Sequence, residues 1–507
     1  MEMPSTFIRG ILLIFVAFYG LFTFCMYSAF FIWSGAVFQR TTEQRRLELL
    51  LAKDRLWNLS KQWEGFSHHF LTLKNGFKFH YVSSDNLLAM ENTSQTMATK
   101  KSKARKPLVI FMHGFPDSWA IWRHLLVSSV LWEKSTIVAF DLPGYGGSDS
   151  LKKYGATEVL EHVAEFILAI RRKYGINVNG NGDGDKVTDS DTGAGASGDK
   201  KQNPAKVILV AHDWGAVIGF RLASEAPQLV DRFILTNGPL LPLARANISL
   251  AWKSSGKMFM TFLRNPFHSH RLLLRAISRL SPLLRQLFLS GYIFVFQLPM
   301  PIVRYVGSGG NYSLLKAIHQ RAAGKVDEFT VRDAQESMAS TLGPGRSECN
   351  TTTKDGEAYP PSVLRRSKLG NFGDMISYYR HGAAVSTWHK SLETISALYG
   401  LGESRRTSSG MPLQDGPHGA LRANATIVWG ERDRALDPRV ILEGIADYLV
   451  HGSQLVILPR TAHYTPMEAE GRAALEKAVE WAICGEHGDV GAAIADVYPG
   501  AVVTVRK

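Results

Sequence analysis

The sequence predicts an α/β fold: a largely parallel β-sheet, interrupted by a helical lid and preceded by one apolar N-terminal helix. Short apolar runs rich in β-branched residues each end in a turn, which is typical of strands buried on both faces. The predicted strands are residues 108–112, 136–141, 426–429 and 455–458, together with the apolar run within residues 207–215. Residues 241–421 separate the two groups of strands, and we predict a mostly helical lid there. Residues 10–39 carry no charged side chain.

Asp213 stands at the apex of a tight turn that ends the apolar run at residues 207–215, VILVAHDWG. The small residues Ala211 and Gly215 flank it at the spacing of a nucleophile elbow, a sharp strand-to-helix turn that lifts a side chain above the sheet. The usual apex residue, Ser, needs a base to become nucleophilic, whereas Asp is already ionised at neutral pH. A carboxylate can displace a leaving group at saturated carbon, so the pattern points to opening of a strained or halogenated carbon. The alternative is a buried strand followed by a surface Asp-Trp-Gly turn.

A second strand end supplies the loop that would bind an oxyanion. Residues 108–112 run into His113-Gly114-Phe115-Pro116, where an elbow fold places one backbone N–H donor; the residue after the nucleophile gives the other. The donors would be the amides of Phe115 and Trp214. For His113 and His212 we favour structural roles. The Gly-rich loop at residues 142–149 has the spacing of neither a P-loop nor a dinucleotide fingerprint.

An acid and a histidine follow later strand ends. Asp433 comes shortly after residues 426–429, and His463 comes after residues 455–458. Nucleophile, acid and histidine in this order, each just past a strand, is the arrangement of the α/β-hydrolase fold. Asp433 would hold the tautomer of His463 and stabilise its cation; Asp437, farther from the strand end, is the fallback acid.

Five motifs then identify a family. They are His113-Gly-Phe-Pro, residues 141–149 (DLPGYGGSD), His212-Asp-Trp-Gly, Gly430-Glu-Arg-Asp433 and Ala462-His-Tyr-Thr-Pro-Met. Over residues 66–485 the chain resembles the α/β-hydrolase-fold epoxide hydrolases. His-Asp-Trp-Gly alone is shared with haloalkane dehalogenases, but Phe115 stands where many dehalogenases have a halide-binding Asn. The elbow has Ala211 where Gly is common, a small departure.

The resemblance also implies two lid tyrosines that donate hydrogen bonds to the epoxide oxygen. One is Tyr292, which opens the sequence YIFVFQLP, and the other is Tyr379 in Tyr-Tyr-Arg at residues 378–380. Each alone would more often be a packed aromatic with a satisfied hydroxyl. The substrate pocket is expected to contain His113, Pro116, Trp214 and Tyr378.

The implied reaction converts an epoxide to a vicinal diol without a metal or organic cofactor. Asp213 would form an alkyl ester while Tyr292 and Tyr379 polarise the ring oxygen, and His463 would then activate the water that hydrolyses the ester. One rival is haloalkane dehalogenation at the same Asp. The other is a low-turnover binding protein of this fold, which gains nothing obvious from an intact nucleophile, acid, base and tyrosine pair.

The apolar N-terminal run predicts a single membrane anchor with a span of about 10–36. A helix needs about 20 such residues to cross a bilayer, and the run is too long for the apolar region of a secretory signal. Five basic residues, Arg40, Arg45, Arg46, Lys53 and Arg55, follow the span against Arg9 before it, which favours a cytosol-facing catalytic part. Only three Cys occur, so no disulfide framework is evident. N-glycosylation sequons argue for the opposite orientation, at Asn58, Asn92, Asn247, Asn311, Asn350 and Asn424. We expect a single-pass protein of the endoplasmic reticulum.

The expected divisions are an anchor and linker (1–65), the first half of the core (66–240), the lid (241–421), the second half of the core (422–485) and a tail (486–507). Residues 66–83 predict a hairpin with an Asn75-Gly76 turn that opens the sheet. Polar insertions are expected as surface loops at residues 85–106, 176–204, 341–368 and 401–421.

The net charge of +13 raises the question of an acidic partner. The basic run at residues 100–106 is interpreted as a solvated loop, and we expect no nucleic acid partner. In the lid, Arg271, Arg275 and Arg279 recur at helical spacing among apolar residues, which would suit contact with anionic lipid. We favour an ordinary solvated lid helix instead. The expected partners are a lipophilic epoxide and, through the N-terminal helix, a bilayer.

Overall fold

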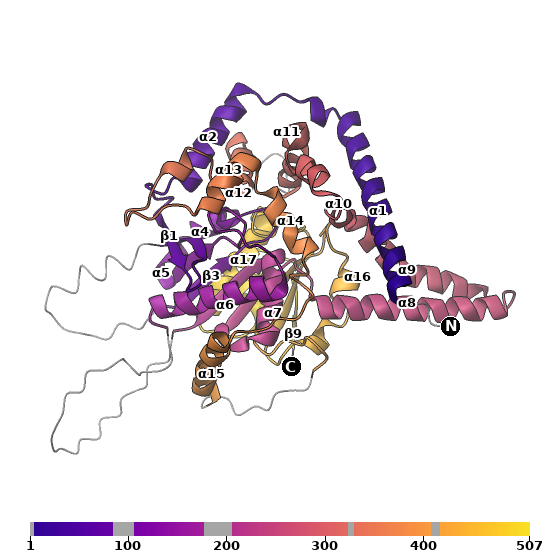
Figure 1. Cartoon of the computed structure of the whole chain (residues 1–507). Coiled ribbons are helices and arrows are strands. Elements are labelled where there is room, and N and C mark those ends of the chain that lie inside the picture. The colour runs from indigo at the N-terminus through magenta and orange to yellow at the C-terminus, as the bar shows by residue number, and fades with distance from the viewer. Residues whose placement is uncertain (1–4, 85–105, 177–204, 323–328, 407–415, 507) are drawn as a thin grey trace, which may run out of the picture.

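A nine-stranded sheet forms the centre of the computed structural model, which describes residues 5–84, 106–176, 205–322, 329–406 and 416–506 (Figure 1). Its strands are β1 (Phe66–Thr72), β2 (Lys78–Ser84), β3 (Leu108–Met112), β4 (Thr136–Phe140), β5 (Val207–His212), β6 (Arg232–Thr236), β7 (Ala425–Gly430), β8 (Gln454–Leu458) and β9 (Val502–Val505). Their order across the sheet is β1-β2-β4-β3-β5-β6-β7-β8-β9. Strands β3 to β8 run parallel, while β1, β2 and β9 pair antiparallel. The parallel strands therefore end at one edge.

The predicted α/β-hydrolase fold is confirmed, and the central strands explain why their sequences are apolar throughout. Every residue of β3, β5, β6 and β7 is buried, because helices cover both faces of the sheet. The core helices are α4 (Arg123–Leu126), α5 (Ser129–Lys134), α6 (Ala156–Lys173), α7 (Trp214–Glu225), α16 (Pro438–Ile441), α17 (Ala469–Ile483) and α18 (Val490–Ile494). Short 3₁₀ helices lie at η1 (Ala36–Phe38), η2 (Trp119–Trp122), η3 (Pro227–Leu229), η5 (Glu348–Asn350) and η6 (Ile445–Tyr448).

The predicted opening hairpin forms as β1 and β2. Phe66 pairs with Ser84 and Thr72 pairs with Lys78, and Gly76 in the turn has a φ of 84°. The tail was not expected to join the sheet. Its strand β9 nevertheless pairs with β8, and Tyr498 before it is fully buried, so residues 486–506 belong to the core.

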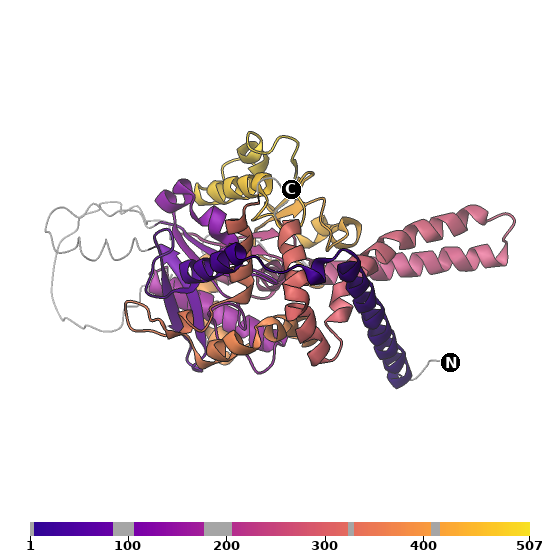
Figure 2. The ribbon, with the colours of Figure 1, turned by 90° about the horizontal axis from the view of Figure 1, so that it is seen from above.

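The lid lies between β6 and β7. Its helices are α8 (Leu241–Arg264), α9 (His270–Leu289), α10 (Gly291–Val295), α11 (Met300–Ala322), α12 (Val331–Leu342), α13 (Pro361–Leu369), α14 (Phe372–Arg380) and α15 (Leu392–Arg406). Helices α8 and α9 form a long hairpin that projects away from the sheet in both views (Figures 1 and 2).

One predicted loop is instead packed structure. Residues 341–368 include most of α13, and the buried guanidinium of Arg366 donates hydrogen bonds to the backbone carbonyls of Gly146 and Ser148 at 3.0 and 2.7 Å. A polar side chain of this segment thus donates hydrogen bonds to backbone carbonyls of the turn after β4. Composition alone does not indicate such long-range partners. The predicted loops at 85–106 and 176–204 lie almost wholly outside the described residues, as does part of 401–421.

The N-terminal helix α1 (Ser5–Trp33) contains a stretch from Gly10 to Trp33 that is long and apolar enough to cross a membrane. The helix ends before the predicted limit at residue 36, because the chain turns at Gly35 with a φ of 70°. The expected linker contains helix α2 (Glu43–Trp57). Trp57 at its end is buried and donates a hydrogen bond to the carbonyl of Ala339 in the lid at 2.9 Å.

Candidate active site

Asp213 occupies the turn between β5 and α7 with a φ of 52°, a conformation that non-glycine residues rarely adopt. The turn is tight because two neighbours lack side chains. A Cβ added at Gly215 would lie 2.5 Å from the carbonyl oxygen of Met112, and one added at Gly114 would lie 2.4 Å from Asp213 Oδ1. Such strain persists only where the surroundings enforce it. The local structure is that of a nucleophile elbow.

The predicted oxyanion loop contacts this carboxylate directly. The backbone N–H of Phe115 donates a hydrogen bond to Asp213 Oδ1 at 2.7 Å. The amide of Trp214 begins α7, directly after Asp213. A group bonded to the other oxygen of Asp213 would leave Oδ1 facing the Phe115 donor.

His463 and Asp433 meet Asp213 from the other half of the core. His463 Nε2 lies 3.5 Å from Asp213 Oδ2, and His463 Nδ1 lies 2.8 Å from Asp433 Oδ2. The fallback acid, Asp437, instead pairs with Arg439 at 2.9 Å and Arg285 at 3.4 Å. The geometry therefore brings Asp433, rather than Asp437, to the histidine.

The two carboxylates control the charge of His463. Burial lowers the pKa of this imidazole, but Asp433 and Asp213 together outweigh burial and raise the pKa to about 10. Both ring nitrogens then donate, one to each carboxylate. The neighbouring His212 behaves oppositely, since burial lowers its pKa to about 4, and its Nε2 donates to the carbonyl of His463 at 2.9 Å.

Asn237 completes the acid side of the site and was missed from the sequence. It follows β6, is fully buried, and donates from Nδ2 to Asp433 Oδ2 at 2.8 Å. Its Oδ1 accepts from the hydroxyl of Thr465 at 2.7 Å. The backbone amides of Ala435 and Leu436 donate to Asp433 Oδ1. Burial raises the pKa of Asp433, but His463, Asn237 and these amides outweigh it and hold the pKa below its ordinary value. The available signal was the position of Asn237 just past a strand end.

The two lid tyrosines lie together above the nucleophile's loop. The rings of Tyr292 and Tyr379 are 6.1 Å apart at 83°, and the Tyr379 ring is 4.9 Å from Trp214 and 5.6 Å from Phe115. Burial and the negative charge of Asp213 both raise the pKa of Tyr292. For Tyr379, burial comes first, followed by Tyr292 and Asp213. Both phenols therefore keep their protons and can donate hydrogen bonds.

The remaining predicted residues surround this centre. His113 accepts at Nε2 from the amide of Leu142 and contacts the Gly114 carbonyl through Nδ1, both at 2.9 Å, so both ring nitrogens are used in fixing the loop. Pro116 is buried. Tyr378 donates its hydroxyl to the carbonyl of Pro143 at 2.9 Å, and its ring lies 5.5 Å from Trp214. Tyr378 can therefore shape a pocket only through its ring.

Asp117, in the predicted oxyanion loop, is a second buried acid near the site. Burial raises its pKa to about 7, against the opposing charge of Arg123 and a hydrogen bond from Ser340 at 3.2 Å. The charge of Asp213 contributes in the same direction as burial.

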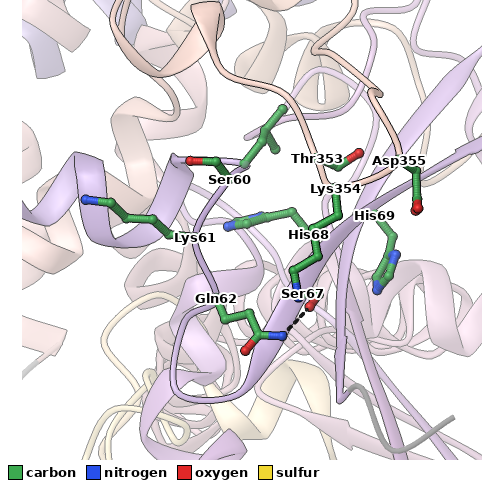
Figure 3. Close-up of a pocket in the computed structure, with 10 residues that line it drawn as sticks. Ser60, Lys61, Gln62, Ser67, His68, His69, Thr353, Lys354 and Asp355 are labelled. Carbon is green, nitrogen blue, oxygen red and sulfur yellow. Dashed lines mark hydrogen bonds between the residues drawn. The ribbon is translucent and has the colours of Figure 1, made fainter. Parts of the chain in front are cut away.

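A small cavity of about 50 Å³ is lined by none of the predicted site residues (Figure 3). His68 in its wall contacts His80 Nε2 through Nδ1 at 2.9 Å, and His80 Nδ1 contacts Asp141 at 2.8 Å. The chain of hydrogen bonds ties β1 and β2 to the turn after β4.

The chain is similar in sequence to proteins named epoxide hydrolases. The chain is 26% identical to a mouse (Mus musculus) protein named Epoxide hydrolase 3 over 411 residues, covering 79% of this chain and 74% of that one. It is 22% identical to the human (Homo sapiens) Epoxide hydrolase 4 over 402 residues, covering 78% and 74%. A crystal structure of a Bacillus megaterium epoxide hydrolase aligns with 21% identity and a TM-score of 0.44, covering 82% and 99%.

The model of the alpha/beta hydrolase family matches residues 109–478. The match includes the elbow at Asp213, the lid, and both Asp433 and His463, and it extends over well more than half of the chain. The protein therefore belongs to the alpha/beta hydrolase family.

Proposed function

We propose that this protein hydrolyses epoxides to vicinal diols through an alkyl ester on Asp213. The observation that carries the proposal is the position of one carboxylate between a histidine–aspartate pair and two protonated phenols. His463 Nε2 lies 3.5 Å from Asp213 Oδ2. The Tyr379 ring lies 4.9 Å from that of Trp214, the residue after Asp213, and 6.1 Å from that of Tyr292, and the charge of Asp213 helps to raise the pKa of both phenols. Relatives named epoxide hydrolases, at 22–26% identity over most of the chain, support the same activity.

In the first step, a carboxylate oxygen of Asp213 attacks one epoxide carbon and the C–O bond of the ring breaks. The oxygen that leaves carbon becomes an alkoxide, which takes a hydrogen bond and then a proton from the phenols of Tyr292 and Tyr379. General acid catalysis of this kind typically contributes about 10²–10⁴-fold. A halide leaving group would need no such acid, which disfavours the dehalogenase alternative.

In the second step, water attacks the ester carbonyl of Asp213. His463 takes the proton of that water at Nε2, and the amides of Phe115 and Trp214 would stabilise the tetrahedral oxyanion. Loss of one such donor typically costs about 3–4 kcal/mol. Once Asp213 is esterified, the proton that His463 already carried passes through solvent to the tyrosinate, which frees Nε2 to accept the proton of the water. Collapse of the intermediate releases the diol and regenerates the carboxylate, and the proton taken from water stays on His463 for the next turnover.

Replacing His463 tests the order of these steps. In His463→Gln the ester should form and persist, so the intact protein should gain the mass of the epoxide. Asp213→Ala should gain no mass. Normal turnover by His463→Gln, with unmodified protein, would contradict the role of the histidine. A single turnover of the unmodified protein in ¹⁸O-water should label Asp213 rather than the first diol, and label in that diol would exclude the ester.

The substrate class follows from the walls of the site. Phe296 connects the site residues, with its ring 5.5 Å from Tyr292, 5.3 Å from Tyr379 and 5.4 Å from Phe115. Aromatic walls favour a lipophilic epoxide, to be sought by a diol assay across aryl and fatty-acid epoxides. Halide release from haloalkanes, in place of diol formation, would favour the dehalogenase.

For location, we propose a single-pass anchor in the endoplasmic reticulum through α1, with the catalytic part in the cytosol. The apolar stretch at Gly10–Trp33 and the basic residues after it support this orientation. A shift in mass on treatment with an N-glycosidase would place the catalytic part in the lumen instead.

A further inference from the structure

The α8–α9 hairpin exposes more large apolar side chains than a solvated hairpin would. Eleven of them are exposed: Ile248, Leu250, Trp252, Phe259, Met260, Leu263, Phe267, Leu274, Ile277, Leu284 and Phe288. Phe267, at the tip, is 90% exposed. The hairpin projects as a separate arm in both views (Figures 1 and 2). An apolar surface of this extent marks a site of association rather than a surface facing water.

The buried positions in the middle of the arm are small residues. Ser255 and Ala276 are the buried residues in the middle of the arm, and the Ser255 hydroxyl donates to the carbonyl of Ala276 at 2.9 Å. Close packing through small and hydroxyl side chains is the mode used by helices in membranes, where large side chains turn outward toward lipid. The apolar residues of the hairpin are thus not its own core.

The charge of the arm indicates what its exposed apolar surface binds. Residues 241–290 contain eight Lys or Arg and no Asp or Glu. In the described part of the chain, the ion pairs of the arm lie toward its base, Arg279 with Glu443 at 3.7 Å and Arg285 with Asp437 at 3.4 Å. Apolar side chains mixed with basic side chains suit the interface of an anionic bilayer, where long basic side chains reach the headgroups.

The arm is continuous with the apolar helix α1. The Tyr19 hydroxyl of α1 donates to the carbonyl of Leu287 in α9 at 3.2 Å, and its ring lies 4.9 Å from Phe294 in α10. In both views α1 lies on the side of the molecule from which the arm projects (Figures 1 and 2). A membrane that receives α1 therefore meets the arm as well.

We propose that the α8–α9 hairpin is a second membrane-binding element, which lies in the interface of an anionic phospholipid bilayer with its apolar side chains among the acyl chains. The proposal does not depend on the reaction that the site catalyses. It replaces the expectation of a solvated lid helix around Arg271, Arg275 and Arg279, because Leu274 and Ile277 beside them are more than half exposed.

Depth-dependent fluorescence quenching on the full chain tests the proposal. Cys25, Cys349 and Cys484 are replaced by Ser, and a fluorescent NBD probe is attached through Phe267→Cys at the tip. The matched control carries the probe through Lys354→Cys, also exposed but in a turn near α13. Both proteins are reconstituted in vesicles of phosphatidylcholine and phosphatidylserine, with and without brominated acyl chains.

The probe at residue 267 should shift to shorter wavelength and lose emission with brominated lipid, while the probe at 354 should do neither. In the 267-labelled protein, Arg271→Gln with Arg275→Gln should reduce that quenching toward its value in pure phosphatidylcholine. A tip probe with water-like emission and no quenching would overturn the proposal. So would a shielded probe that lipid does not quench but that crosslinks to a second copy, because the surface would then be a dimer interface.

Discussion

His463 lies between two carboxylates, and this position explains how it could serve a two-step reaction. Before reaction, Asp213 and Asp433 outweigh the effect of burial and raise the pKa of the imidazole to about 10. Esterification would remove the charge of Asp213, leaving Asp433 alone to oppose burial. The pKa of His463 would then fall, so the imidazole could give up its proton and act as a base on water.

Asp433 and Asp437 offer a matched pair of acids for testing the role of the histidine's partner. Asp433→Asn should lower kcat by a factor on the order of 10³–10⁴, because the wrong tautomer of His463 is then favoured. Asp437→Asn should leave kcat within a few-fold, since that carboxylate caps α16 and pairs with Arg439. Steady-state diol formation measures both, and equal losses would remove Asp433 from its assigned role.

The phenols can be tested by deleting single oxygens. Tyr292→Phe and Tyr379→Phe should each lower the rate of alkylation on the order of 10²-fold, and the double variant should lose more. Tyr359→Phe is the control, because its buried hydroxyl donates to the carbonyl of Trp57 at 2.7 Å, and its loss should cost about 1 kcal/mol of stability and little rate. Stopped-flow single turnovers follow the ester. An unchanged rate in the double variant would exclude the phenols as acids.

Helix α1 contacts α10, the short helix that carries Tyr292, so the N-terminal helix also supports the lid. A Cβ added at Gly20 would lie 2.5 Å from the carbonyl oxygen of Phe294, which leaves no room for a side chain. In the same helix, a Cβ at Gly10 would meet nothing within 4 Å. A side chain at Gly20 would therefore collide with α10, whereas one at Gly10 would not.

Gly20→Leu should separate α1 from α10, displace Tyr292, and lower kcat/KM by up to about a hundredfold. Gly10→Leu adds the same side chain to the same helix at a position that does not contact α10, so this variant should retain the activity. Diol formation in membranes, at matched protein content, gives the comparison. Equal activity of the two variants would mean that α1 plays no part in positioning the phenol.

Elements that depend on local pattern could be predicted, and those that depend on neighbours could not. Asp213, Asp433 and His463 each follow an apolar strand, so order along the chain predicts the three side chains that the fold brings together. Asn237 reaches Asp433 because β6 lies beside β7, and its position just past a strand end does not by itself indicate which acid it meets. Tyr292 and Tyr379 came from family resemblance rather than from periodicity. Residues 341–368 have the composition of a loop because their polar side chains form hydrogen bonds with distant segments, as Arg366 does with the turn after β4.

Several buried histidines couple the stability of the whole protein to pH. Burial lowers the pKa of His319 to about 3 and that of His212 to about 4. In the unfolded chain these groups take up protons near pH 6.5, so the unfolded state binds more protons at pH 4–6.5 and stability falls as the pH drops through that range. The raised pKa of His463 acts oppositely, with stability lost as pH rises through about 10.

His319→Gln should therefore reduce the loss of thermal stability between pH 8 and pH 5, even if its melting temperature at pH 8 is lower. His319 lies in the lid and contacts the Thr341 hydroxyl at 2.9 Å. Melting temperatures of the solubilised protein across this range give the slope. A slope identical to that of the unmodified protein would show that His319 takes up no proton on unfolding.

Because the lid is inserted between β6 and β7, the proposed nucleophile Asp213 is synthesised long before Asp433 and His463. A nascent or truncated chain that stops inside the lid contains Asp213 but neither Asp433 nor His463. If such a fragment folded enough to react with an epoxide, the ester on Asp213 would form once and persist, because no His463 would be present to hydrolyse it. Quality control that removes incomplete chains would therefore also protect the cell from spent, adduct-bearing copies.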